Sequence, residues 1–385
     1  MSYVPQEKFM RRAIELAKLG GAHVHPNPLV GSVIVRGEEI LAEGYHHRYG
    51  DLHAERDCLK NAAEKKVDLT GAQMYVTLEP CCHTGKQPPC TQAVIESGIK
   101  TVIIGSRDPN ELVDGKGVRQ LEDAGITVIQ DFLREECDSI NSVFFHYIRT
   151  KRPYVIVKYA MTADGKTSLS TGESKWITGG SARENVHRTR GTASAIMCGI
   201  KTVLADNPML NCRAEGSQYK NPLRVILDRN LELPVECNIS KSAGEIPTLV
   251  FCSDSVIGDT ERSCHAEKLR ALGIEIIAAG EKNGHLDLEK VLELLGERKV
   301  DSVFVESGGL LNSSFFFGGT HGRKCLANEV HCYVAPKITG GTSGSVHSPV
   351  QGIECSSLAE CVKMKVLETK NFDEDILIRY MVCNK

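Results

Sequence analysis

The sequence predicts an α/β protein of two domains. Short apolar runs typical of buried strands alternate with stretches whose apolar residues recur at helical spacing, which is the pattern of a sheet covered by helices. The chain has 385 residues, whereas a single domain usually has roughly 100–200. Lys151-Arg152-Pro153 separates two such alternating series. We therefore expect one domain over residues 1–150 and a second over residues 151–385.

In the first domain, apolar residues at helical spacing predict a helix over residues 7–19, which Gly20-Gly21 would end. Short apolar runs predict strands at 31–35, 74–78, 102–105 and 126–129. Helical patterns between and after these runs predict helices at 54–64, 91–97, 117–124 and 132–148.

The second domain begins with a predicted strand, and more apolar runs follow it along the chain. The predicted strands are 154–158, 195–199, 224–227, 248–252, 274–278, 302–305 and 330–334. The predicted helices are 181–190, 287–297 and 309–316. We find no internal repeat and no low-complexity tract.

Composition narrows the classes of partner and compartment. The balance of 46 Lys+Arg against 49 Asp+Glu gives a net charge of −3, so the chain has no long-range positive field for gathering nucleic acid. No apolar run reaches the roughly 18 residues of a membrane span, and the N-terminus lacks the apolar core of a signal peptide. The 15 cysteines are odd in number and scattered, as in reducing compartments. We expect a cytoplasmic protein without nucleic-acid or membrane partners.

The strongest chemical signal is His53-Ala54-Glu55, followed by Pro80-Cys81 and by Pro88-Pro89-Cys90. One imidazole and two thiolates suit Zn²⁺ and leave the fourth coordination position to water, as in catalytic sites. Glu55 lies two residues from His53, so it can take a proton from that water and pass it to a leaving amine. This is the zinc-deaminase pattern. We expect His53 and Cys81 each to begin a helix after a strand, with Cys90 in the helical turn beyond.

The residues alone leave two other interpretations open. The zinc could be structural, with Cys82 or His83 as a fourth ligand, or the group could bind no metal. Some other histidines are expected at surface or loop positions: His23, His25, His46 and His47.

Further motifs accompany the zinc pattern: His25-Pro26-Asn27-Pro28, Gly44-Tyr45-His46, Tyr75–Cys90 and Asp108-Pro109-Asn110. Together they resemble the bifunctional deaminase–reductase family of riboflavin biosynthesis. Eight residues separate Cys81 from Cys90, whereas nucleoside and nucleic-acid deaminases have two residues between their cysteines.

The resemblance implies a cytidine-deaminase-like three-layer domain that deaminates 2,5-diamino-6-(5-phosphoribosylamino)pyrimidin-4(3H)-one. In this family His53, Cys81 and Cys90 would hold zinc, and Glu55 would shuttle protons. Residues matching positions near the pyrimidine or its phosphate are Asn27, His83 and Lys86.

The second half resembles the family's reductase domain over residues 158–178, 190–213, 224–229 and 305–311. The resemblance implies a dihydrofolate-reductase-like fold that uses NADPH to reduce the ribosyl group to ribityl. It places these residues beside NADPH: Ala160, Trp176, Thr202, Asp206, Arg229, Gly308, Gly309, Leu310, Leu311, Asn312, Ser313 and Ser314. It places these beside the substrate: Lys158, Ser174, Arg190, Leu210, Arg213 and Glu306.

General physical chemistry supports some of these binding roles independently of the family resemblance. Glycines at 308–309 let a backbone approach a diphosphate at a helix N-terminus, and guanidinium groups at Arg190 and Arg213 match phosphate oxygens in pairs. No G-x-G-x-x-G follows any predicted strand, so NADPH is implied by the resemblance alone.

Two stretches depart from the family pattern. The segment Phe316–Lys324 is glycine-rich and basic where the family runs through one helix, and Gln87 stands where Thr is common. The first departure bears on reductase competence.

Two functions compete with a bifunctional enzyme acting on a small molecule. A nucleoside or tRNA deaminase with an unrelated C-terminal domain would have a Cys-x-x-Cys pair. A zinc-stabilised binding protein would have no need for Glu55. The sequence is compatible with a homo-oligomer but does not specify one.

Overall fold

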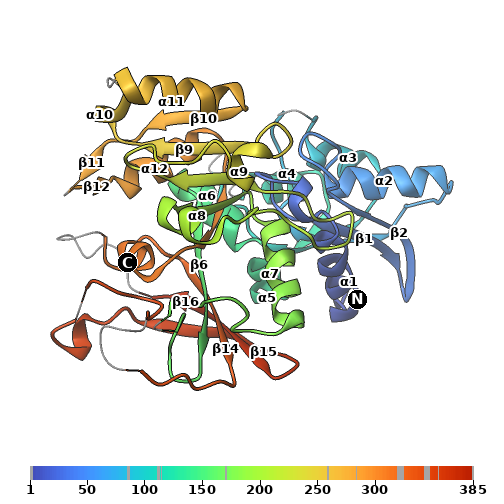
Figure 1. The fold of residues 1–385 in the computed structure, drawn as a ribbon. Coiled ribbons are helices and arrows are strands. Elements are labelled where there is room, and N and C mark those ends of the chain that lie inside the picture. The colour runs from blue at the N-terminus through green and yellow to red at the C-terminus, as the bar shows by residue number, and fades with distance from the viewer. Residues whose placement is uncertain are drawn as a thin grey trace. The chain divides into compact units, whose positions relative to one another are not determined.

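The structure is a computed structural model that describes residues 3–84, 87–110, 113, 115–169, 171–257, 260–282, 284–318, 325–341, 347–353 and 355–383. The chain divides into two compact units, Met1–Lys151 and Arg152–Lys385 (Figure 1). Each unit is an α/β fold, which confirms the predicted fold class. Within the described residues, none of the helices has the length and apolar character needed to cross a bilayer.

The first unit is built on a five-stranded sheet in the order β2-β1-β3-β4-β5. Strand β1 pairs antiparallel with β2 and β3, whereas β3, β4 and β5 run parallel. The strands are β1 Gly31–Arg36, β2 Glu39–Tyr45, β3 Gln73–Leu78, β4 Thr101–Ser106 and β5 Thr127–Ile129. Strand β2 was not predicted from the sequence.

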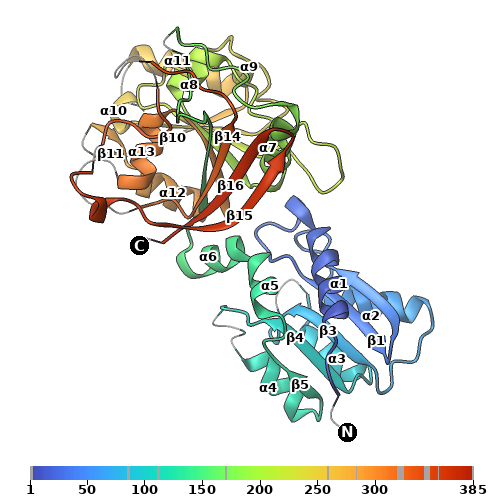
Figure 2. The ribbon, with the colours of Figure 1, turned by 90° about the horizontal axis from the view of Figure 1, so that it is seen from below.

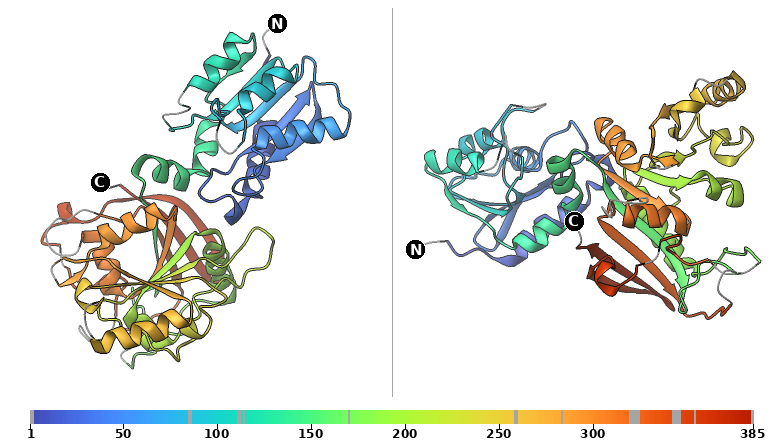
Figure 3. Two further views of the ribbon diagram at one scale, coloured as in Figure 1. Left: turned by 90° about the horizontal axis from the view of Figure 1, so that it is seen from above. Right: turned by 90° about the vertical axis from the view of Figure 1, so that its left-hand side faces the viewer.

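Helices cover both faces of this sheet, as Figure 3 shows. They are α1 Glu7–Lys18, α2 Ala54–Glu64, α3 Cys90–Glu96, α4 Lys116–Asp123, α5 Arg134–Ser139 and α6 Ser142–Thr150, with a short 3₁₀ turn at Gly21–His23. Because side chains alternate along a strand, Tyr75 packs with α1 and α5, whereas its neighbours Met74 and Val76 pack with α2, α3 and α4. The unit therefore has three layers.

The helix expected over 132–148 is two helices, α5 and α6, divided at Asn141. The buried Asn141 side chain accepts a hydrogen bond from the Leu29 backbone N–H and donates one to the Leu29 carbonyl, both at 2.9 Å. These two hydrogen bonds to Leu29, which is distant in sequence, hold Asn141 in a non-helical conformation. The helix is therefore interrupted at this residue.

Helix α2 packs closely on β2 at Gly44. A Cβ atom at position 44 would lie 2.3 Å from the backbone nitrogen of Cys58, so no side chain fits there without moving the helix. Glycine at this position therefore sets the separation of α2 from the sheet.

The second unit has a nine-stranded sheet in the order β10-β9-β8-β7-β13-β6-β14-β16-β15. The seven strands from β10 to β14 in this order are parallel, and the hairpin β15–β16 joins antiparallel beside β14 (Figure 2). Bounds of the seven are β6 Tyr154–Thr162, β7 Ala195–Gly199, β8 Leu223–Leu227, β9 Thr248–Cys252, β10 Ile274–Ala278, β13 Ser302–Glu306 and β14 Glu329–Ala335. Strands not predicted from the sequence are β15 Met364–Phe372, β16 Asp375–Val382 and the small ribbon of β11 Glu281–Lys282 with β12 His285–Leu286.

Helices also cover both faces of this second sheet. They are α7 Gly180–Thr192, α8 Ile200–Asp206, α9 Asn238–Lys241, α10 Asp254–Ile257, α11 Thr260–Ala271, α12 Leu288–Glu297 and α13 Gly309–Phe317, with a 3₁₀ turn at Leu358–Glu360. Helices α12 and α13 pack on one face, and α7, α8, α9 and α11 on the other. The parallel strands all end at one edge of the sheet, where ligands bind in open α/β folds.

Candidate active sites

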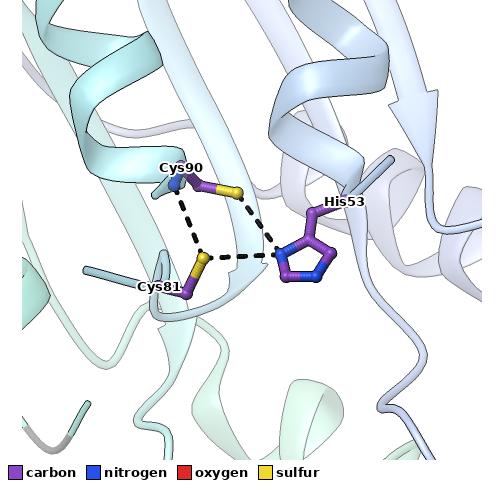
Figure 4. A group of neighbouring side chains, drawn as sticks. All are labelled: His53, Cys81 and Cys90. Carbon is purple, nitrogen blue, oxygen red and sulfur yellow. Dashed lines mark hydrogen bonds between the residues drawn. The ribbon is translucent and has the colours of Figure 1, made fainter. Parts of the chain in front are cut away.

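Three side chains of the first unit converge on one point (Figure 4). His53 is the residue before the first turn of α2, Cys90 begins α3, and Cys81 lies in the loop after β3. The expectation that Cys81 begins a helix is wrong. Its carbonyl instead accepts from the Thr91 N–H at 3.2 Å, so the loop folds back onto α3, and it is Cys90 that begins the helix.

The spacing of these three side chains fits a metal ion. The Nδ1 atom of His53 lies 3.4 Å from the Sγ of Cys81 and 3.4 Å from the Sγ of Cys90, and all three ligand atoms lie within 4.8 Å of one another. A tetrahedral zinc with ordinary bond lengths would separate nitrogen and sulfur by roughly 3.6 Å. The donor set of one imidazole and two thiols is also that of zinc rather than of harder cations.

Neither alternative fourth ligand joins the group. Among the described residues, the cluster able to hold a metal consists of His53, Cys81 and Cys90, without Cys82 or His83. Three protein ligands leave one coordination position to water, which is the arrangement of a catalytic zinc.

The start of α3 prepares Cys81 for metal binding. The backbone N–H of Cys90 donates to the Cys81 Sγ at 3.4 Å. The Cys90 thiol and the His53 imidazole together lower the pKa of Cys81 to about 4, although burial opposes them. A thiol of such low pKa is a thiolate at neutral pH, which is the form that binds zinc.

Glu55 lies in the first turn of α2 and is only 3% exposed. Burial, with a smaller effect of Cys81, raises the pKa of its carboxyl to about 7. A carboxyl of this pKa beside the metal ligands can both accept and donate a proton near neutral pH, as general acid–base catalysis requires.

His46 is buried rather than at the surface, although it does lie in a loop. Its Nδ1 lies 2.9 Å from the Leu52 carbonyl and its Nε2 lies 3.0 Å from the Asn27 amide nitrogen. The ring is 2% exposed, and it meets the His53 ring edge-on at 5.5 Å. These contacts connect Asn27 through His46 to the ligand His53, and the role of Asn27 near the pyrimidine or its phosphate stays a prediction. Lys86 lies outside the described residues.

Two side chains hold the ligand loop in place: Arg56, which the sequence did not single out, and Gln87, one of the departures from the family pattern. Arg56 donates from Nε to the Pro88 carbonyl at 3.0 Å and from Nη2 to the Pro89 carbonyl at 2.8 Å. Gln87 donates to the Gly50 carbonyl at 3.1 Å. The only sign of the Arg56 contacts in the sequence was the position of this arginine directly after the His-x-Glu motif.

In the second unit, Lys158 on β6, Arg190 on α7 and Glu306 at the end of β13 form one ionic cluster. Arg190 donates from Nε and Nη2 to the two Glu306 oxygens at 2.5 and 3.0 Å, and the Lys158 Nζ lies 3.5 Å from Glu306 Oε2. Burial favours protonation of Glu306, but Arg190 and Lys158 outweigh it and hold the carboxyl pKa at about 2. Arg190 is therefore already paired with a carboxylate.

Arg213 is exposed, and its partners among the described residues are neutral. Its Nη2 lies 2.8 Å from His187 Nε2, and its Nη1 donates to the Asn211 side-chain oxygen at 3.1 Å. Burial and the nearby cations Arg190 and Arg213 lower the pKa of His187 to about 4, so that imidazole is neutral at pH 7. Neutral partners fix the Arg213 side chain while leaving its charge available for a phosphate group.

The remaining two predicted substrate residues differ in exposure. Ser174 is half-buried. Leu210 is 3% exposed and packs in the core with α8 and α9. Its backbone, at φ 48°, is in the left-handed region.

The predicted cofactor turn lies between β13 and α13. Gly308 precedes the first turn of α13, and a Cβ there would meet nothing within 4 Å, so the backbone is open to an approaching group. A Cβ at Gly309 would lie 2.5 Å from the Ser348 carbonyl oxygen. Glycine is thus required at 309 by packing, and at 308 it leaves room for a diphosphate.

Residues along α13 divide by burial. Leu310 is 56% exposed at the start of the helix, Leu311 packs on the core, and Ser314 bonds the Leu310 carbonyl. Asn312 and Ser313 are 1% and 2% exposed. Asn312 accepts from Ser307 Oγ at 2.7 Å and donates to the Pro349 carbonyl at 2.9 Å. The Asn312 side chain therefore connects the turn to Ser307 and Pro349.

The other predicted cofactor residues belong to elements near the carboxyl edge of the sheet. Ala160 is half-buried on β6, Thr202 and Asp206 lie on α8 after β7, and Arg229 follows β8 and bonds the Gly284 carbonyl. Adjacent parallel strands bring these segments to one edge.

Trp176 is 66% exposed at φ 66°, with the Arg183 guanidinium 4.1 Å from its ring centre. Its carbonyl accepts from Lys337 Nζ at 2.8 Å. The indole therefore lies at the surface on an anchored backbone.

The glycine-rich segment expected at Phe316–Lys324 begins inside a regular helix. Helix α13 continues through Phe317, and Gly318 ends it at φ 64°. Residues 319–324 lie outside the described residues. The described part of the departure thus leaves the diphosphate turn and its helix intact.

Two protein-family models match the chain. The model for the cytidine and deoxycytidylate deaminase zinc-binding region matches residues 4–106. The model for the RibD C-terminal domain matches residues 153–378, more than half of the chain.

Curated relatives match over nearly the whole length. The riboflavin biosynthesis protein RibD of Actinobacillus pleuropneumoniae is 48% identical over 374 residues, covering 97% of this chain and 94% of that protein. The Escherichia coli RibD is 35% identical, covering 97% and 98%.

Solved structures agree with these relatives. A Thermotoga maritima diaminohydroxyphosphoribosylaminopyrimidine deaminase/5-amino-6-(5-phosphoribosylamino)uracil reductase superposes with a TM-score of 0.83 at 38% identity, covering 98% of each chain. Acinetobacter baumannii RibD also gives 0.83, at 34% identity, covering 98% of this chain and 99% of that one.

Proposed function

The chain belongs to the RibD family, and we propose which of its residues carry each of that family's two activities. The protein is a bifunctional deaminase and reductase of riboflavin biosynthesis, with zinc and NADPH as cofactors. We assign deamination to the first unit, residues 1–150, and reduction to the second, residues 151–385. A nucleoside or tRNA deaminase with an unrelated second domain is not favoured.

The substrates follow from the activity named for the Thermotoga maritima relative. The first reaction adds water to 2,5-diamino-6-(5-phosphoribosylamino)pyrimidin-4(3H)-one and releases ammonia, giving the 5-aminouracil. The second reduces the ribosyl group of that product to ribityl. Both molecules carry a phosphate, so each unit should offer cationic side chains or backbone N–H groups to bind it.

For the deaminase, His53, Cys81 and Cys90 hold the zinc ion, which when bound lowers the pKa of a water molecule towards ~7. Glu55 takes the proton from the attacking water and delivers it to the leaving amino group. The arrangement suits this because Glu55 is buried in the first turn of α2, two residues from the ligand His53. Its burial also protects the transferred proton from exchange with bulk water.

For the reductase, the Gly308-Gly309 turn would hold the diphosphate of NADPH, which would supply a hydride when bound. Arg213 binds the substrate phosphate because its charge has no carboxylate partner. Arg190 and Lys158 fix the position of Glu306 beside the substrate. Arg190 thus acts through Glu306 rather than as a phosphate ligand of its own.

We propose a cytoplasmic location, as the odd number and scatter of the 15 cysteines along the chain suggest. We propose that the small-molecule substrates and cofactors are its principal partners. Titration of the unfolded, unreduced protein with a thiol reagent should then find every cysteine reactive, whereas a shortfall matching disulfide pairs would contradict this location.

The observation that carries the function is the convergence of His53, Cys81 and Cys90 beside buried Glu55. The purified full chain should be given the diaminopyrimidine phosphoriboside with and without NADPH, and the products identified by mass. Without NADPH the amino group should be replaced by oxygen. With NADPH the product should also gain two hydrogens. Recovery of unchanged substrate from zinc-loaded protein would contradict the assignment.

A further inference from the structure

Arg224, on β8, is a charged residue in an apolar strand and is completely buried. Its guanidinium has five N–H donors, and all are used. Nε donates to Thr248 Oγ1 at 2.9 Å, Nη1 donates to the Met209 carbonyl and Ser242 Oγ at 3.2 and 2.7 Å, and Nη2 donates to the Ile239 and Ile246 carbonyls, both at 3.0 Å.

These partners are hydroxyls and backbone carbonyls, and none is a carboxylate. Burial lowers the pKa of Arg224 to about 10, so the group is still protonated at neutral pH. An uncompensated buried charge opposes folding unless every donor is satisfied. The five bonds satisfy acceptors from separate segments of the chain, so Arg224 ties these segments together as well as filling space in the core.

The Met209 carbonyl, one of these acceptors, belongs to loop 207–213. This loop carries Arg213, and the Asn211 carbonyl accepts from Arg190 Nη1 at 3.2 Å. The loop therefore touches both arginines of the substrate side. Asn207 and Leu210 have φ values of 42° and 48°, a backbone region that residues other than glycine adopt only when their surroundings hold them there.

Asn238, the first residue of α9, holds the same loop at a second point. Its backbone N–H donates to Asn207 Oδ1 and its side-chain Nδ2 donates to the Asn207 carbonyl, both at 2.8 Å. Arg224 donates to the Ile239 carbonyl, next to Asn238 in α9, and to the hydroxyl of Ser242, directly after the helix. Helix α9 and Arg224 thus form one support for loop 207–213.

We propose that Arg224 and Asn238 are positioning residues of the reductase, which hold loop 207–213 in the conformation that presents Arg213 to the substrate phosphate. This rests on the proposed role of Arg213. The support acts mainly on substrate recognition, because it reaches Arg213 through loop 207–213 whereas the predicted cofactor turn at Gly308-Gly309 belongs to another loop; Asp206, a predicted cofactor residue, ends α8 directly before the loop.

The test compares three variants of the full chain: Arg224→Lys, Asn238→Ala and Ser240→Ala. Lysine keeps the charge but has three donors rather than five. Ser240 is the matched control, because it is buried on α9 and donates to the Pro234 carbonyl without touching loop 207–213. Reduction of chemically supplied aminouracil phosphoriboside gives KM for the substrate and for NADPH, and deamination and Tm are measured on the same samples.

Arg224→Lys should raise the substrate KM about tenfold or more, and Asn238→Ala several-fold, with the NADPH KM and the deamination rate changed less than about twofold. Ser240→Ala should lower Tm with an unchanged substrate KM. An unchanged substrate KM in Asn238→Ala, which tests the support even if Arg224→Lys does not fold, would overturn the proposal. So would a rise in substrate KM in Ser240→Ala that matches its loss of Tm. Absence of reduction in the unaltered chain would instead refute the proposed function.

Discussion

Arg190 and Glu306 meet through two parallel hydrogen bonds, at 2.5 and 3.0 Å, with both side chains largely buried. The sequence predicts the same role, phosphate binding, for Arg190 and Arg213, but this pairing distinguishes them. Arg190 is committed to a carboxylate, whereas Arg213 has only neutral partners. The two should therefore respond differently to mutation.

Arg213→Ala should raise the substrate KM of the reductase by roughly 10- to 100-fold, since a charge-assisted bond is worth about 1.5–3 kcal/mol. The KM for NADPH and the Tm should change little, because the side chain is exposed. Steady-state titrations of each substrate against the other measure both constants. A raised KM for NADPH with an unaltered KM for the substrate would show that Arg213 contacts the cofactor instead.

Arg190→Ala should act mainly on stability. It leaves the Glu306 carboxylate buried with Lys158 alone, and breaking a buried pair typically costs about 3–5 kcal/mol. Chemical unfolding of the variant should show a clear loss in the second unit. Loss of substrate affinity with unchanged stability would instead favour direct phosphate binding by Arg190.

Cys81→Ser and Cys90→Ser should each lose most of the bound zinc, because a hydroxyl is a much poorer ligand than a thiolate. Cys82→Ser is the matched control and should retain about one zinc per chain, since Cys82 does not belong to the ligand group. Metal analysis after dialysis measures the content. Full retention of zinc in both Cys81→Ser and Cys90→Ser would contradict the assignment of these cysteines as ligands.

Glu55→Gln should keep zinc and lose deamination by roughly 10²–10⁴-fold, the usual range for a general acid–base residue. Reduction of supplied aminouracil phosphoriboside should be unaffected, since we assign it to the other unit. If a folded Glu55→Gln variant lost both activities, the assignment of one reaction to each unit would be wrong.

Stability of the second unit should fall in acid through Glu306. Its folded-state pKa is about 2, below the ordinary 4.5, so the ionised carboxylate stabilises the fold above pH 4.5. That contribution, on the order of 3 kcal/mol, is lost as the pH falls towards 2. Denaturant unfolding between pH 6 and 3 should show a shallower acid slope for Glu306→Gln than for the unaltered chain. Equal slopes would contradict this origin.

Trp176 is the single tryptophan of the chain, and it offers a direct probe of cofactor binding. It is exposed and is predicted to lie beside NADPH, so titration with NADPH should quench its emission with saturation. Trp176→Phe should abolish the signal. Saturable NADPH binding detected by calorimetry without any change in emission would place the cofactor elsewhere.

Much of the architecture could be predicted because parallel strands buried on both faces form short apolar runs. Strands β7, β8 and β9 are of this kind. Strand β15 could not be found this way, because its side chains from Met364 to Asn371 are exposed and mostly polar. The break at Asn141 depends on a partner, Leu29, that is distant in sequence. Local periodicity carries no information on such contacts.

The zinc group could be predicted because its chemistry requires particular residue types at recognisable spacing. The reductase residues were implied by the family resemblance alone. The structure was needed to show that Arg190 is paired with the carboxylate of Glu306 whereas Arg213 has neutral partners. Arg224 was missed. The only sign of its role in the sequence was an arginine at the start of the apolar run RVIL. A charged residue in that position is equally typical of the exposed end of a strand.

Gly44 touches neither ligand nor metal, yet it controls where both His53 and Glu55 lie, since any Cβ there would push α2 away from β2. Position 44 is accordingly closed to the other nineteen amino acids. In a library of all single substitutions selected for growth without riboflavin, Gly44 should be as intolerant as the metal ligands. The neighbouring position Glu43, whose carboxylate is paired with Arg12 at a partly exposed site, should accept many replacements.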